Sequence, residues 1–404
     1  MTDVRVLSGK RVTLGVTGSI AAYKGVALAS ALHQAGAVVD VAMTLDAQRF
    51  VQPLSFQAIT HRPVFADLWA PGMETDIAHV TLGRESELIV VAPATANMLA
   101  KLAHGLADDP VSVTALAARC PLVVAPAMDA GMFTHPATAA NIATLRQRGV
   151  IVVDPEEGHL ASGLTGLGRL ASPETIVDRI RAALGAGGDL AGRRVLVTAG
   201  GTQEAIDPVR YITNHSSGRM GYAIAEAARD RGASVVLVTT PTSLRIPGGV
   251  ACVAVRTAQQ MLDAITSQYA RLDVLIMSAA VADFRVESEA RHKIKRGETG
   301  LELRLVPNPD LLATTAELSV DSRPVRVGFA AETRDLLEQA TQKLARKSLD
   351  LIVANDVGGD VFGSDSNEVT LLWAGGRHAA LPRMLKTEVA EKVLDAVSGL
   401  LPRV

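Results

Sequence analysis

The sequence predicts an α/β protein made of two Rossmann-like domains, and three observations support this prediction. Short apolar runs alternate with amphipathic helical stretches along the chain, a pattern typical of a parallel sheet with helices on both faces. A glycine-rich stretch, residues 185–194, interrupts the alternation and is typical of a linker. A chain of 404 residues also exceeds the usual size of one domain. We therefore predict one domain over residues 1–186 and a second over residues 193–404.

The first domain is expected to alternate strands and helices in chain order. Its strands are the short apolar runs at residues 12–16, 38–42, 88–92, 122–125 and 150–153. Its helices are the longer amphipathic stretches at residues 21–34, 95–103, 136–148 and 173–184. Ligands of such folds bind at the carboxyl ends of the strands. The loops that follow the strands are therefore the candidate binding loops.

The second domain repeats this alternation and adds strands near its end. Its expected strands are residues 194–197, 234–239, 274–278, 301–306, 325–330 and 351–354, followed by a hairpin of residues 369–373 and 379–381. Its expected helices are residues 220–231, 257–269, 309–318, 334–347 and 386–400. We therefore predict a mainly parallel sheet with extra strands.

Composition narrows the range of partners. A formal net charge of −2 gives no reason to expect binding to nucleic acid or to an anionic membrane. No apolar run approaches the roughly 20 residues that span a bilayer, and the N-terminus lacks the apolar segment of a signal peptide. The two cysteines, Cys120 and Cys252, exclude a disulfide framework. We therefore expect a cytoplasmic protein that binds neither nucleic acid nor membrane.

Residues 198–221 hold the most informative pattern of the chain. A Gly-Gly turn opens this stretch, and a second polar turn, NHSSG, precedes the next expected helix. Glycine permits a close approach of the backbone, and free N–H groups at a helix N-terminus attract anions. With Asp207, Arg210 and Asn214 between the turns, the stretch predicts a site for a phosphate-bearing ligand and a carboxylate. The alternative is an ordinary strand–helix connection in which a serine of NHSSG caps the helix.

Four loops of the first domain follow strands and carry small or hydroxylated residues. In chain order they contain Gly18 and Ser19, Thr44, Thr95 and Asn97, and residues 125–138. Each loop alone is most often only the capped start of a helix, but four at one sheet edge favour a bound phosphate or planar cofactor. The first loop is not a complete G-x-G-x-x-G fingerprint, so NAD binding is weakly supported.

Motifs in both halves resemble those of one family. In the first half they are GSIAAYK, APATAN, PAM-x-x-x-M and GRL, and in the second DPVRYITNHSSG, AAVADFR, KIKR, NPDLL, GFAAET and LDLIVAND. In this order, over nearly the whole chain, they resemble the bifunctional phosphopantothenoylcysteine decarboxylase/phosphopantothenate–cysteine ligase of coenzyme A biosynthesis. The resemblance implies CTP-dependent ligation of cysteine to 4′-phosphopantothenate through an acyl-cytidylate, and then FMN-dependent decarboxylation to 4′-phosphopantetheine.

In the first domain the resemblance implies a flavodoxin-like cysteine decarboxylase that binds FMN and assembles as trimers. Gly18 and Ser19 would contact the phosphate or ribityl chain of the flavin. Thr44, Thr95 and Asn97 would hold its remaining polar edge. A flavin supplies the electron sink that decarboxylation beside an oxidised thiol requires.

Three further residues of this domain are catalytic candidates. His79 matches the family's catalytic histidine, a base that also orients the substrate; the alternative is a partly buried structural histidine. Asp129 stands where the family most often has an asparagine, whose amide can donate to the substrate carboxylate. Ser162 stands where many relatives have a cysteine as proton donor, and its hydroxyl is a weaker acid than a thiol. The last proton would then come from water, Thr165 or another group, or this half would be slow.

In the second domain the resemblance implies a ligase site for CTP, 4′-phosphopantothenate and L-cysteine. CTP would be held by Met277, Ser278, Ala279, Asp283, Lys293, Pro309, Asp310, Leu311, Leu312, Phe329, Lys343 and Lys347. Asn214 would hydrogen-bond the acyl-cytidylate, Arg210 would position the substrate, and Lys293 would assist the attack by cysteine. Mg²⁺ is expected through the CTP phosphates, near Asp283, without an assigned protein ligand. This domain would form dimers, which together with the trimers could build a homo-oligomer as large as a dodecamer.

Three alternatives stay open from the sequence. A general NAD(P) oxidoreductase would need the complete dinucleotide fingerprint, which neither half contains. A flavin-binding regulatory or assembly protein is compatible with the first half only, because the ligase motifs are intact. A ligase-only enzyme would keep the first half as a scaffold or regulatory flavin binder, and the residues at Asp129 and Ser162 would explain its silence.

Overall fold

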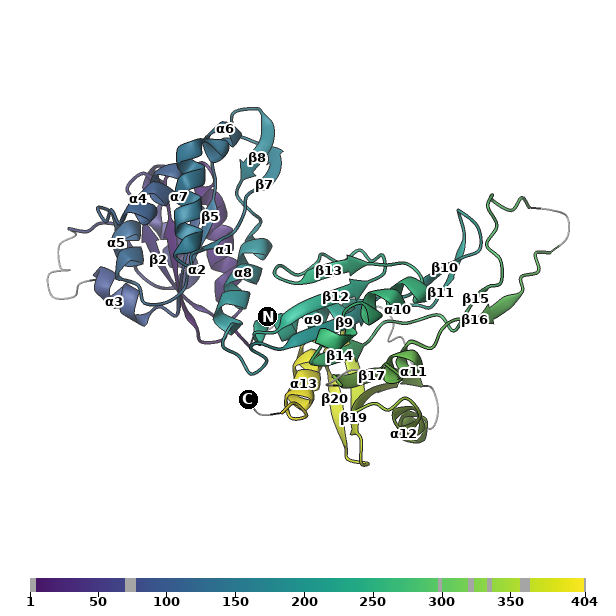
Figure 1. The fold of residues 1–404 in the computed structure, drawn as a ribbon. Helices are drawn as coiled ribbons and strands as arrows, with labels where there is room; N and C mark the ends of the chain where they lie inside the picture. The colour runs from purple at the N-terminus through teal and green to yellow at the C-terminus, as the bar shows by residue number, and fades with distance from the viewer. Residues whose placement is uncertain are drawn as a thin grey trace. The chain divides into compact units, whose positions relative to one another are not determined.

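The computed structural model describes residues 5–69, 78–296, 300–318, 323–332, 336–356 and 364–402. The chain divides into two compact units, Met1–Gly185 and Ala186–Val404, the first running from purple to teal and the second from teal to yellow (Figure 1). Each unit is built on one large, mainly parallel sheet with a separate apolar core on each face. The predicted α/β class with two Rossmann-like domains is confirmed.

The first unit contains a six-stranded parallel sheet in the order β3-β2-β1-β4-β5-β6. The strands are β1 (Arg11–Val16), β2 (Val38–Met43), β3 (Val64–Phe65), β4 (Leu88–Ala94), β5 (Leu122–Pro126) and β6 (Ile151–Val152). Without the two-residue edge strand β3, this is the flavodoxin-like order, which reverses between β1 and β4. The carboxyl ends of β1 and β4 therefore mark the crevice where a ligand is expected.

Strand β4 shows why most strands of this unit could be located from the sequence. All of its residues are buried, with Leu88 and Val90 in the core of one face and Ile89 and Val91 in the core of the other. A parallel strand covered on both faces reads as a continuous apolar run. Strand β3 has only two residues, too few to form such a run, and it was not predicted.

Helices cover both faces of this sheet. They are α1 (Ala22–Gln34), the 3₁₀ helix η1 (Ala47–Arg49), α2 (Pro53–Thr60), α3 (Ala78–Glu85), α4 (Ala96–His104), α5 (Pro110–Ala117), α6 (Ala130–Thr134), α7 (Pro136–Gln147) and α8 (Pro173–Gly185). The sequence predicted α1, α4, α7 and α8. It missed α2, α3 and α5, because two turns are too short to establish a 3.6-residue period.

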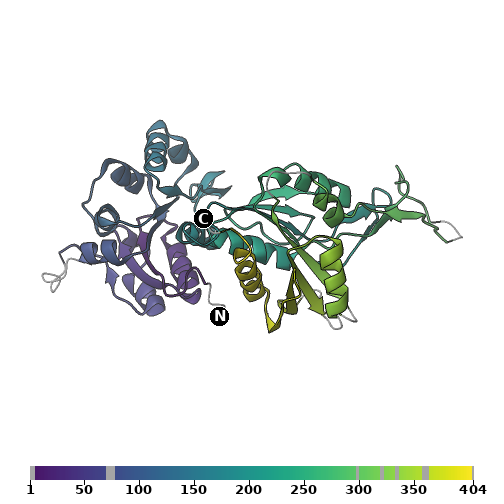
Figure 2. The same cartoon turned by 60° about the horizontal axis from the view of Figure 1, so that its bottom comes forward.

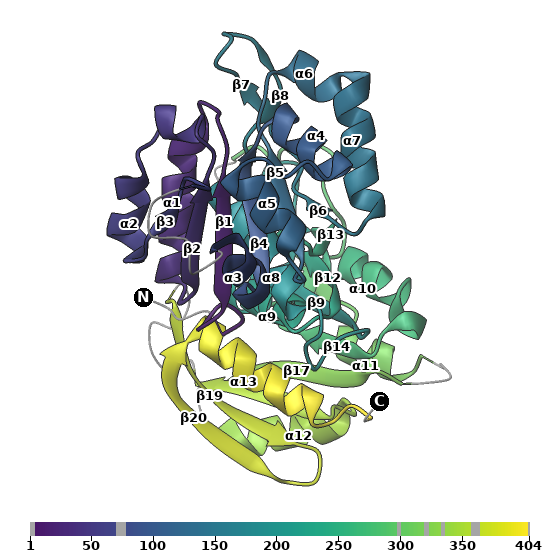
Figure 3. The same cartoon turned by 90° about the vertical axis from the view of Figure 1, so that its left-hand side faces the viewer.

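A polar hairpin, β7 (Glu156–His159) and β8 (Thr165–Arg169), lies next to α6, as Figures 1 and 3 both show. Met128 N donates to Gly168 O over 3.0 Å. A Cβ on Gly168 would stand 2.2 Å from Met128 O, and one on Gly166 would stand 2.9 Å from the Cβ of Ala130. The two glycines therefore let the hairpin lie directly on the turn that follows β5.

The second unit contains an eight-stranded sheet in the order β13-β12-β9-β14-β17-β18-β19-β20. Its strands are β9 (Arg194–Ala199), β12 (Ser234–Thr239), β13 (Ala251–Ala254), β14 (Val274–Met277), β17 (Val325–Glu332), β18 (Leu351–Asp356), β19 (Ser366–Trp373) and β20 (His378–Leu385). Only β19 and β20 pair antiparallel to their neighbours. The predicted parallel sheet with extra strands is confirmed.

Two groups of helices flank this sheet. Helices α9 (Arg219–Asp230) and α13 (Lys386–Ser398) pack against each other and share one apolar core. Helices α10 (Ala258–Thr266) and α11 (Leu311–Ala316) lie in the core of the opposite face, and α12 (Leu336–Arg346) packs on β17 and β18 in a further, smaller core. The 3₁₀ helix η2 (Tyr269–Arg271) follows α10. All five α-helices overlap stretches predicted from the sequence.

Two short hairpin-like sheets project from the eight-stranded sheet of this unit, as Figures 1 and 2 show. One pairs β10 (Gln203–Ala205) with β11 (Tyr211–Thr213), and the other pairs β15 (Phe284–Val286) with β16 (Leu305–Pro307). The predicted strand 301–306 is wrong in its first part, because residues 301–304 are exposed and form no strand. We call these two sheets and the segment between β15 and β16 the arm.

The glycine-rich stretch after α8 is anchored to the second unit. Leu190 is fully buried in that unit's core, and its N–H donates to Arg231 O over 3.0 Å. The Arg231 guanidinium forms ion pairs with Asp189 and Asp395, and the pairing with Arg231 lowers the pKa of Asp189 to about 2. Glycine in this stretch allows close packing as well as chain flexibility. A Cβ on Gly188 would stand 2.5 Å from Arg231 O.

Replacement of Gly221 should destabilise the second unit. A Cβ at this position of α9 would stand 2.7 Å from Thr198 O and from the Cβ of Ala199 in β9. We expect Gly221→Ala to lower the free energy of unfolding by about 1–3 kcal/mol, the usual cost of overpacking. Urea-induced unfolding of the full chain measures it. The matched control is Gly187→Ala, whose Cβ would meet no atom within 4 Å; equal losses in both variants would contradict the prediction.

Candidate functional site

The turns on either side of the arm's first hairpin bring the backbone close to the carboxyl ends of β9 and β14. Gly200 has φ +83°, and a Cβ there would stand 2.1 Å from Thr240 Oγ1. Gly218, with φ +75°, is the N-cap of α9, and no side chain caps this helix. The sequence alternative of a serine cap for α9 is therefore wrong: Ser216 Oγ accepts only from the N–H of Gly218, over 3.3 Å. The first N–H groups of α9 are left for a ligand.

A cavity of about 840 Å³ lies beside this helix start, at the carboxyl ends of β14, β17 and β18. It brings together the following predicted residues: Asn214, Met277, Ser278, Ala279, Asp283, Pro309, Asp310, Leu311, Leu312, Phe329, Lys343 and Lys347. These positions come from segments that are far apart in the chain. Every predicted CTP contact except Lys293 therefore lines a single cavity.

Two lysines approach this cavity from α12 and the turn that follows it. Lys343 Nζ donates to Phe329 O over 2.8 Å. Lys347 forms an ion pair with Asp310, whose other oxygen caps α11 by accepting from Ala313 N over 3.0 Å. Burial would raise the pKa of Asp310, but the bond from Lys347 outweighs it and holds that pKa below its usual range. The charge of Lys347 is therefore already balanced within the protein.

Amide side chains fix the loops on the opposite side of the cavity. Asn214 Nδ2 donates to Val281 O over 3.0 Å, and Asn308 Nδ2 donates to Ala282 O over 2.8 Å. Asp283 itself is exposed at the cavity. Among the residues that the structure describes, no group of three or more His, Cys, Asp and Glu side chains could hold a metal ion.

Arg210 and Lys293 lie outside the residues that line the cavity, and one network in the arm links their segments. The buried Asp207 carboxylate accepts from Arg210 N over 2.9 Å, from Arg210 Nε over 3.0 Å and from Ile294 N over 3.1 Å. Arg210 Nη2 donates in turn to Ile294 O over 3.0 Å. The Arg210 guanidinium holds the pKa of Asp207 far below its usual range. This network fixes the segment carrying the exposed Lys293 to the turn after β10.

In the first unit, the predicted flavin contacts follow the adjacent strands β2, β1 and β4. Gly18 and Ser19 precede α1, and Ser19 Oγ accepts from Ala21 N over 3.2 Å. A Cβ on Gly18 would stand 2.5 Å from that of Asp46, so the loops after β1 and β2 are in contact. Helix α1 begins without a side-chain cap. Small residues, hydroxyls and an uncapped helix start fit a phosphate-bearing flavin here.

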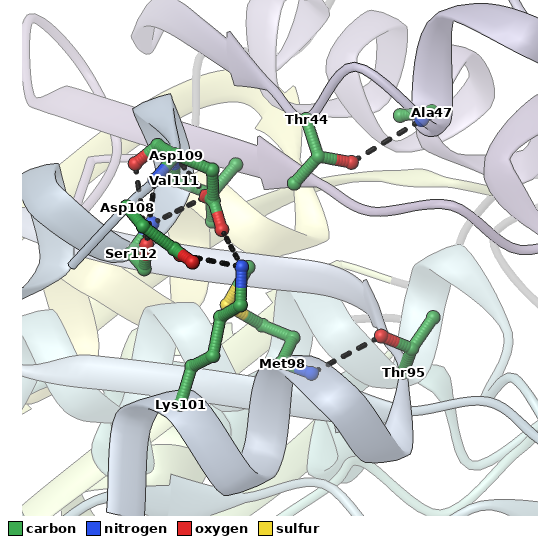
Figure 4. A network of polar contacts seen from close by, with 9 residues as sticks. All are labelled: Thr44, Ala47, Thr95, Met98, Lys101, Asp108, Asp109, Val111 and Ser112. Atoms are coloured by element: carbon green, nitrogen blue, oxygen red, sulfur yellow. Dashed lines mark hydrogen bonds and ion pairs between the residues drawn. The ribbon is translucent and has the colours of Figure 1, made fainter. Parts of the chain in front are cut away.

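Thr44 and Thr95 lie in the same region (Figure 4). Thr44 Oγ1 accepts from Ala47 N, and Thr95 Oγ1 accepts from Met98 N, each over 3.2 Å. Both hydroxyls thus close a turn or cap a helix, and each keeps its own proton to donate to a ligand. Asn97 is exposed in the first turn of α4.

The segment between α4 and α5 is held by a partly exposed ion-pair network, also shown in Figure 4. Lys101 Nζ lies 2.5 Å from Asp108 and 2.8 Å from Asp109. Asp109 also caps α5 by accepting from Ser112 N over 2.9 Å. Burial lowers the pKa of Lys101, but the two carboxylates outweigh it and raise it above its usual value. The network joins the C-terminal half of α4 to the N-terminus of α5.

The two unusual catalytic candidates touch each other. Ser162, at the tip of the β7–β8 hairpin, donates its hydroxyl to Asp129 Oδ2 over 2.6 Å. Asp129 Oδ1 accepts from Gly131 N over 3.0 Å and so caps α6. The bond from Ser162 is the main reason why the pKa of Asp129 lies below its usual range. Asp129 is therefore a carboxylate turned toward donors, and His79 lies apart in the first turn of α3.

Several lining residues of the large cavity were missed as site residues. They are Arg219, Arg346, Asn355, Asn367 and Lys386. Asn355 follows a predicted strand and Lys386 begins a predicted helix, positions that gather at the sheet edge. Only a correct prediction of the strand order could have found Asn367 and Lys386, because the antiparallel strands β19 and β20 bring them to this edge of the sheet.

Comparison with known proteins identifies both units. Residues 2–185 match the Flavoprotein family, and residues 190–400 match the DNA/pantothenate metabolism flavoprotein C-terminal domain. The fold and site thus define a two-domain flavoprotein whose second domain holds a large ligand cavity. No helix in the described part of the chain is long and apolar enough to cross a membrane.

Similar proteins extend over nearly the whole chain. It is 45% identical over 400 residues to the coenzyme A biosynthesis bifunctional protein CoaBC of Bacillus subtilis, covering 98% of both chains. Identity to the protein of the same name from Escherichia coli K12 is 44% over 396 residues, or 97% of both chains. A crystal structure of the C-terminal domain of a CoaBC protein has a TM-score of 0.46 and 41% identity, covering 53% of this chain and 97% of that one. The chain belongs to the family of bifunctional coenzyme A biosynthesis proteins, and the family indicated by its motifs is confirmed.

The Asp207 network should make the stability of the second unit depend on pH. A carboxylate with a lowered pKa stabilises the fold above its unfolded pKa, about 3.9, and loses this effect as pH falls. We expect Asp207→Asn to lower the thermal midpoint of that unit by a constant amount above about pH 5, with the difference shrinking below about pH 4. Calorimetry of the full chain measures it. The exposed Asp263→Asn on α10 is the control, and a difference that grows toward low pH would contradict the prediction.

Proposed function

We propose that this protein catalyses two consecutive steps of coenzyme A biosynthesis. The second unit joins L-cysteine to 4′-phosphopantothenate with CTP, and the first unit decarboxylates the product to 4′-phosphopantetheine with FMN. The single observation that best supports the ligase step is the cavity lined by every predicted CTP contact except Lys293. Family membership supports the pairing of the two steps in one chain.

Ligation requires the carboxylate of 4′-phosphopantothenate to attack the α-phosphorus of CTP. The bond to the β-phosphate breaks, pyrophosphate leaves, and an acyl-cytidylate forms. The cysteine amine then attacks the acyl carbon, loses a proton and displaces CMP. Asn214, held by its bond to Val281 O, stands at the cavity, where its amide can bind the acyl-cytidylate. The uncapped start of α9 offers N–H groups to the phosphates.

The remaining ligase roles belong to charged groups. Mg²⁺ is proposed to bind through the CTP phosphates near the exposed Asp283, since triphosphates are normally handled as metal complexes. Lys343 and Lys347 reach the cavity beside Phe329 and Asp310. Arg210 positions the substrate and Lys293 assists the attack by cysteine; both are carried by the arm, outside this chain's own cavity lining.

Decarboxylation is proposed to occur on the first unit at the carboxyl ends of β1, β2 and β4. FMN, when bound, supplies the electron sink, accepting electrons from the substrate thiol and returning them after carbon dioxide has left. The Thr44 and Thr95 hydroxyls can donate to its polar edge, with Gly18, Ser19 and Asn97 as further contacts. His79 serves as the base.

One observation favours the ligase-only alternative. The Ser162 hydroxyl is donated to Asp129, so its proton points toward a carboxylate of the protein. Asp129 accepts two hydrogen bonds and has none to offer a substrate carboxylate. If neither group changes partner, this first unit would lack both donors and serve as a scaffold or flavin binder.

Assembly and location complete the proposal. We propose a cytoplasmic homo-oligomer, with trimers of the first unit and dimers of the second. Lys293 and Arg210 lie outside the cavity lining in one chain, which agrees with a site completed by a second copy.

The deciding experiment follows both reactions in one vessel. The full-length protein is incubated with 4′-phosphopantothenate, L-cysteine, CTP and Mg²⁺, while CMP, carbon dioxide and 4′-phosphopantetheine are measured together. The proposal expects all three in equal amounts. Release of CMP without carbon dioxide would establish the ligase-only alternative. The absence of both products would refute both activities.

His79→Ala should abolish decarboxylation while the flavin stays bound. Removal of a general base costs about 10²–10⁴-fold in rate, and His79 lies outside the loops proposed to hold FMN. The measurements are carbon dioxide release from supplied 4′-phosphopantothenoylcysteine and the FMN absorption spectrum. Unchanged ligation in the same variant is the internal control, and retained decarboxylation would remove His79 from the mechanism.

Asn214→Asp should abolish ligation. The new carboxylate would face a phosphate-bearing intermediate and could not donate to it, so CMP release should fall about 10²–10³-fold, as for loss of a stabilising donor. Release of CMP from CTP measures the effect. Because the substitution lies in the second unit, decarboxylation of supplied 4′-phosphopantothenoylcysteine should stay normal. Normal ligation by the variant would show that Asn214 does not bind the acyl-cytidylate.

A further inference from the structure

One end of the large cavity is lined by residues to which no role has been given so far. Asn355 is the last residue but one of β18, Asn367 is the second residue of β19, and Lys386 begins α13. All three gather at the carboxyl edge because β20 returns parallel to β18 and delivers α13 to that edge. Strands lie about 4.8 Å apart, so this end is separated from β14 by two or three strand spacings.

The two asparagines of this end have no partner for their amide oxygens. Asn355 Oδ1 and Asn367 Oδ1 are buried and accept no hydrogen bond among the described residues. Asn367 is only 6% exposed. A buried amide oxygen without a partner costs free energy that a bound ligand would recover. Since nothing fixes the oxygen, either amide can turn its NH₂ group toward a ligand oxygen.

Lys386 brings a buried positive charge to the same end. It is 9% exposed, and its Nζ donates to Ser364 O. None of the described carboxylates forms an ion pair with it: Asp365, whose charge partly offsets the lowering of the Lys386 pKa, pairs with Arg219. Burial, and then the charge of Arg219, lower the pKa of Lys386. A buried ammonium at the first turn of a helix is unfavourable unless an anion joins it.

A helix start adds donors beside these side chains. The uncapped N-terminus of α9 lines the same cavity, and α9 packs directly against α13. At the other end of the cavity, Lys347 is already neutralised by Asp310. Among the described residues, Lys386 therefore supplies the positive charge for an anion at the α9–α13 end, since Arg219, which lines the same cavity, is paired with Asp365.

We propose that Lys386 and Asn367, with the first turn of α9, bind the β- and γ-phosphates of the nucleoside triphosphate and hold the pyrophosphate that leaves. This inference rests on the proposed ligase function and assigns its leaving-group subsite. The nucleoside end of the cavity, at Phe329 and Leu312, would bind CMP without these residues. As the carboxylate attacks the α-phosphorus, the electrons of the broken bond pass to the β-phosphate oxygen, and Lys386 stabilises that charge.

The test compares Lys386→Met, which keeps the length of the side chain, with Lys392→Met, an exposed lysine of the same helix. Binding of inorganic pyrophosphate and of CMP to the full-length protein is measured by calorimetry, and pyrophosphate inhibition is measured in the ligase assay. Lys386→Met should weaken pyrophosphate binding at least about tenfold, as expected for loss of a charge-assisted hydrogen bond. CMP affinity should change less than about twofold, and Lys392→Met should resemble the wild type.

A second variant guards against a simple folding defect. Asn367→Asp keeps the shape of the side chain but places a carboxylate against the diphosphate, so it should also weaken pyrophosphate and spare CMP. Unchanged pyrophosphate binding in Lys386→Met would overturn the inference, and so would an equal loss of CMP and pyrophosphate. A wild type that releases no CMP would refute the proposed ligase function itself. Pyrophosphate binding needs no turnover, so it tests the subsite even in that case.

Discussion

The close contact between α9 and β9 is the constraint on which the second site depends. Gly221 has no Cβ, and the first turn of α9 therefore lies against Thr198 and Ala199 at the strand end. The loop after β14 is fixed to the same place, because Ala279 N donates to Thr198 Oγ1 over 3.1 Å and Ala280 N to Gly200 O over 2.8 Å. The helix N-terminus, the loop and the cavity between them are thus positioned by one glycine contact, one hydrogen bond to a threonine hydroxyl and one backbone hydrogen bond.

The two units use the same sheet edge in different ways. In the first unit, Thr95, Asp109 and Asp129 cap the helices that begin at or near this edge. In the second unit α9 has no cap, and buried polar groups at Asn367 and Lys386 face the cavity without a full set of partners. In the first unit the start of α1 has no side-chain cap, and the neighbouring loops add hydroxyls. The second leaves donors and charge for an anionic ligand to complete.

Much of this architecture could be predicted from the sequence, for identifiable reasons. Buried parallel strands such as β4 appear as apolar runs, and long helices such as α9 appear through their period. Most of the arm and β13 could not be predicted, because short exposed strands pair through their backbones and leave little pattern. The motifs placed Asn214, Phe329 and Lys343 in one site. Lys386 and Asn367 carry no local signal, since only the antiparallel return through β19 and β20 brings them there.

The contact between Ser162 and Asp129 makes two positions of the chain interdependent. A cysteine introduced at 162 alone would place its thiol beside the Asp129 carboxylate, which disfavours the thiolate and raises the thiol pKa. An asparagine introduced at 129 alone would remove the acceptor that orients the Ser162 hydroxyl. The effects of the two substitutions on decarboxylation should therefore be non-additive, as a double-mutant cycle would measure. The serine–aspartate pair is thus one unit of the site, and a change at either position alters what the other side chain can do.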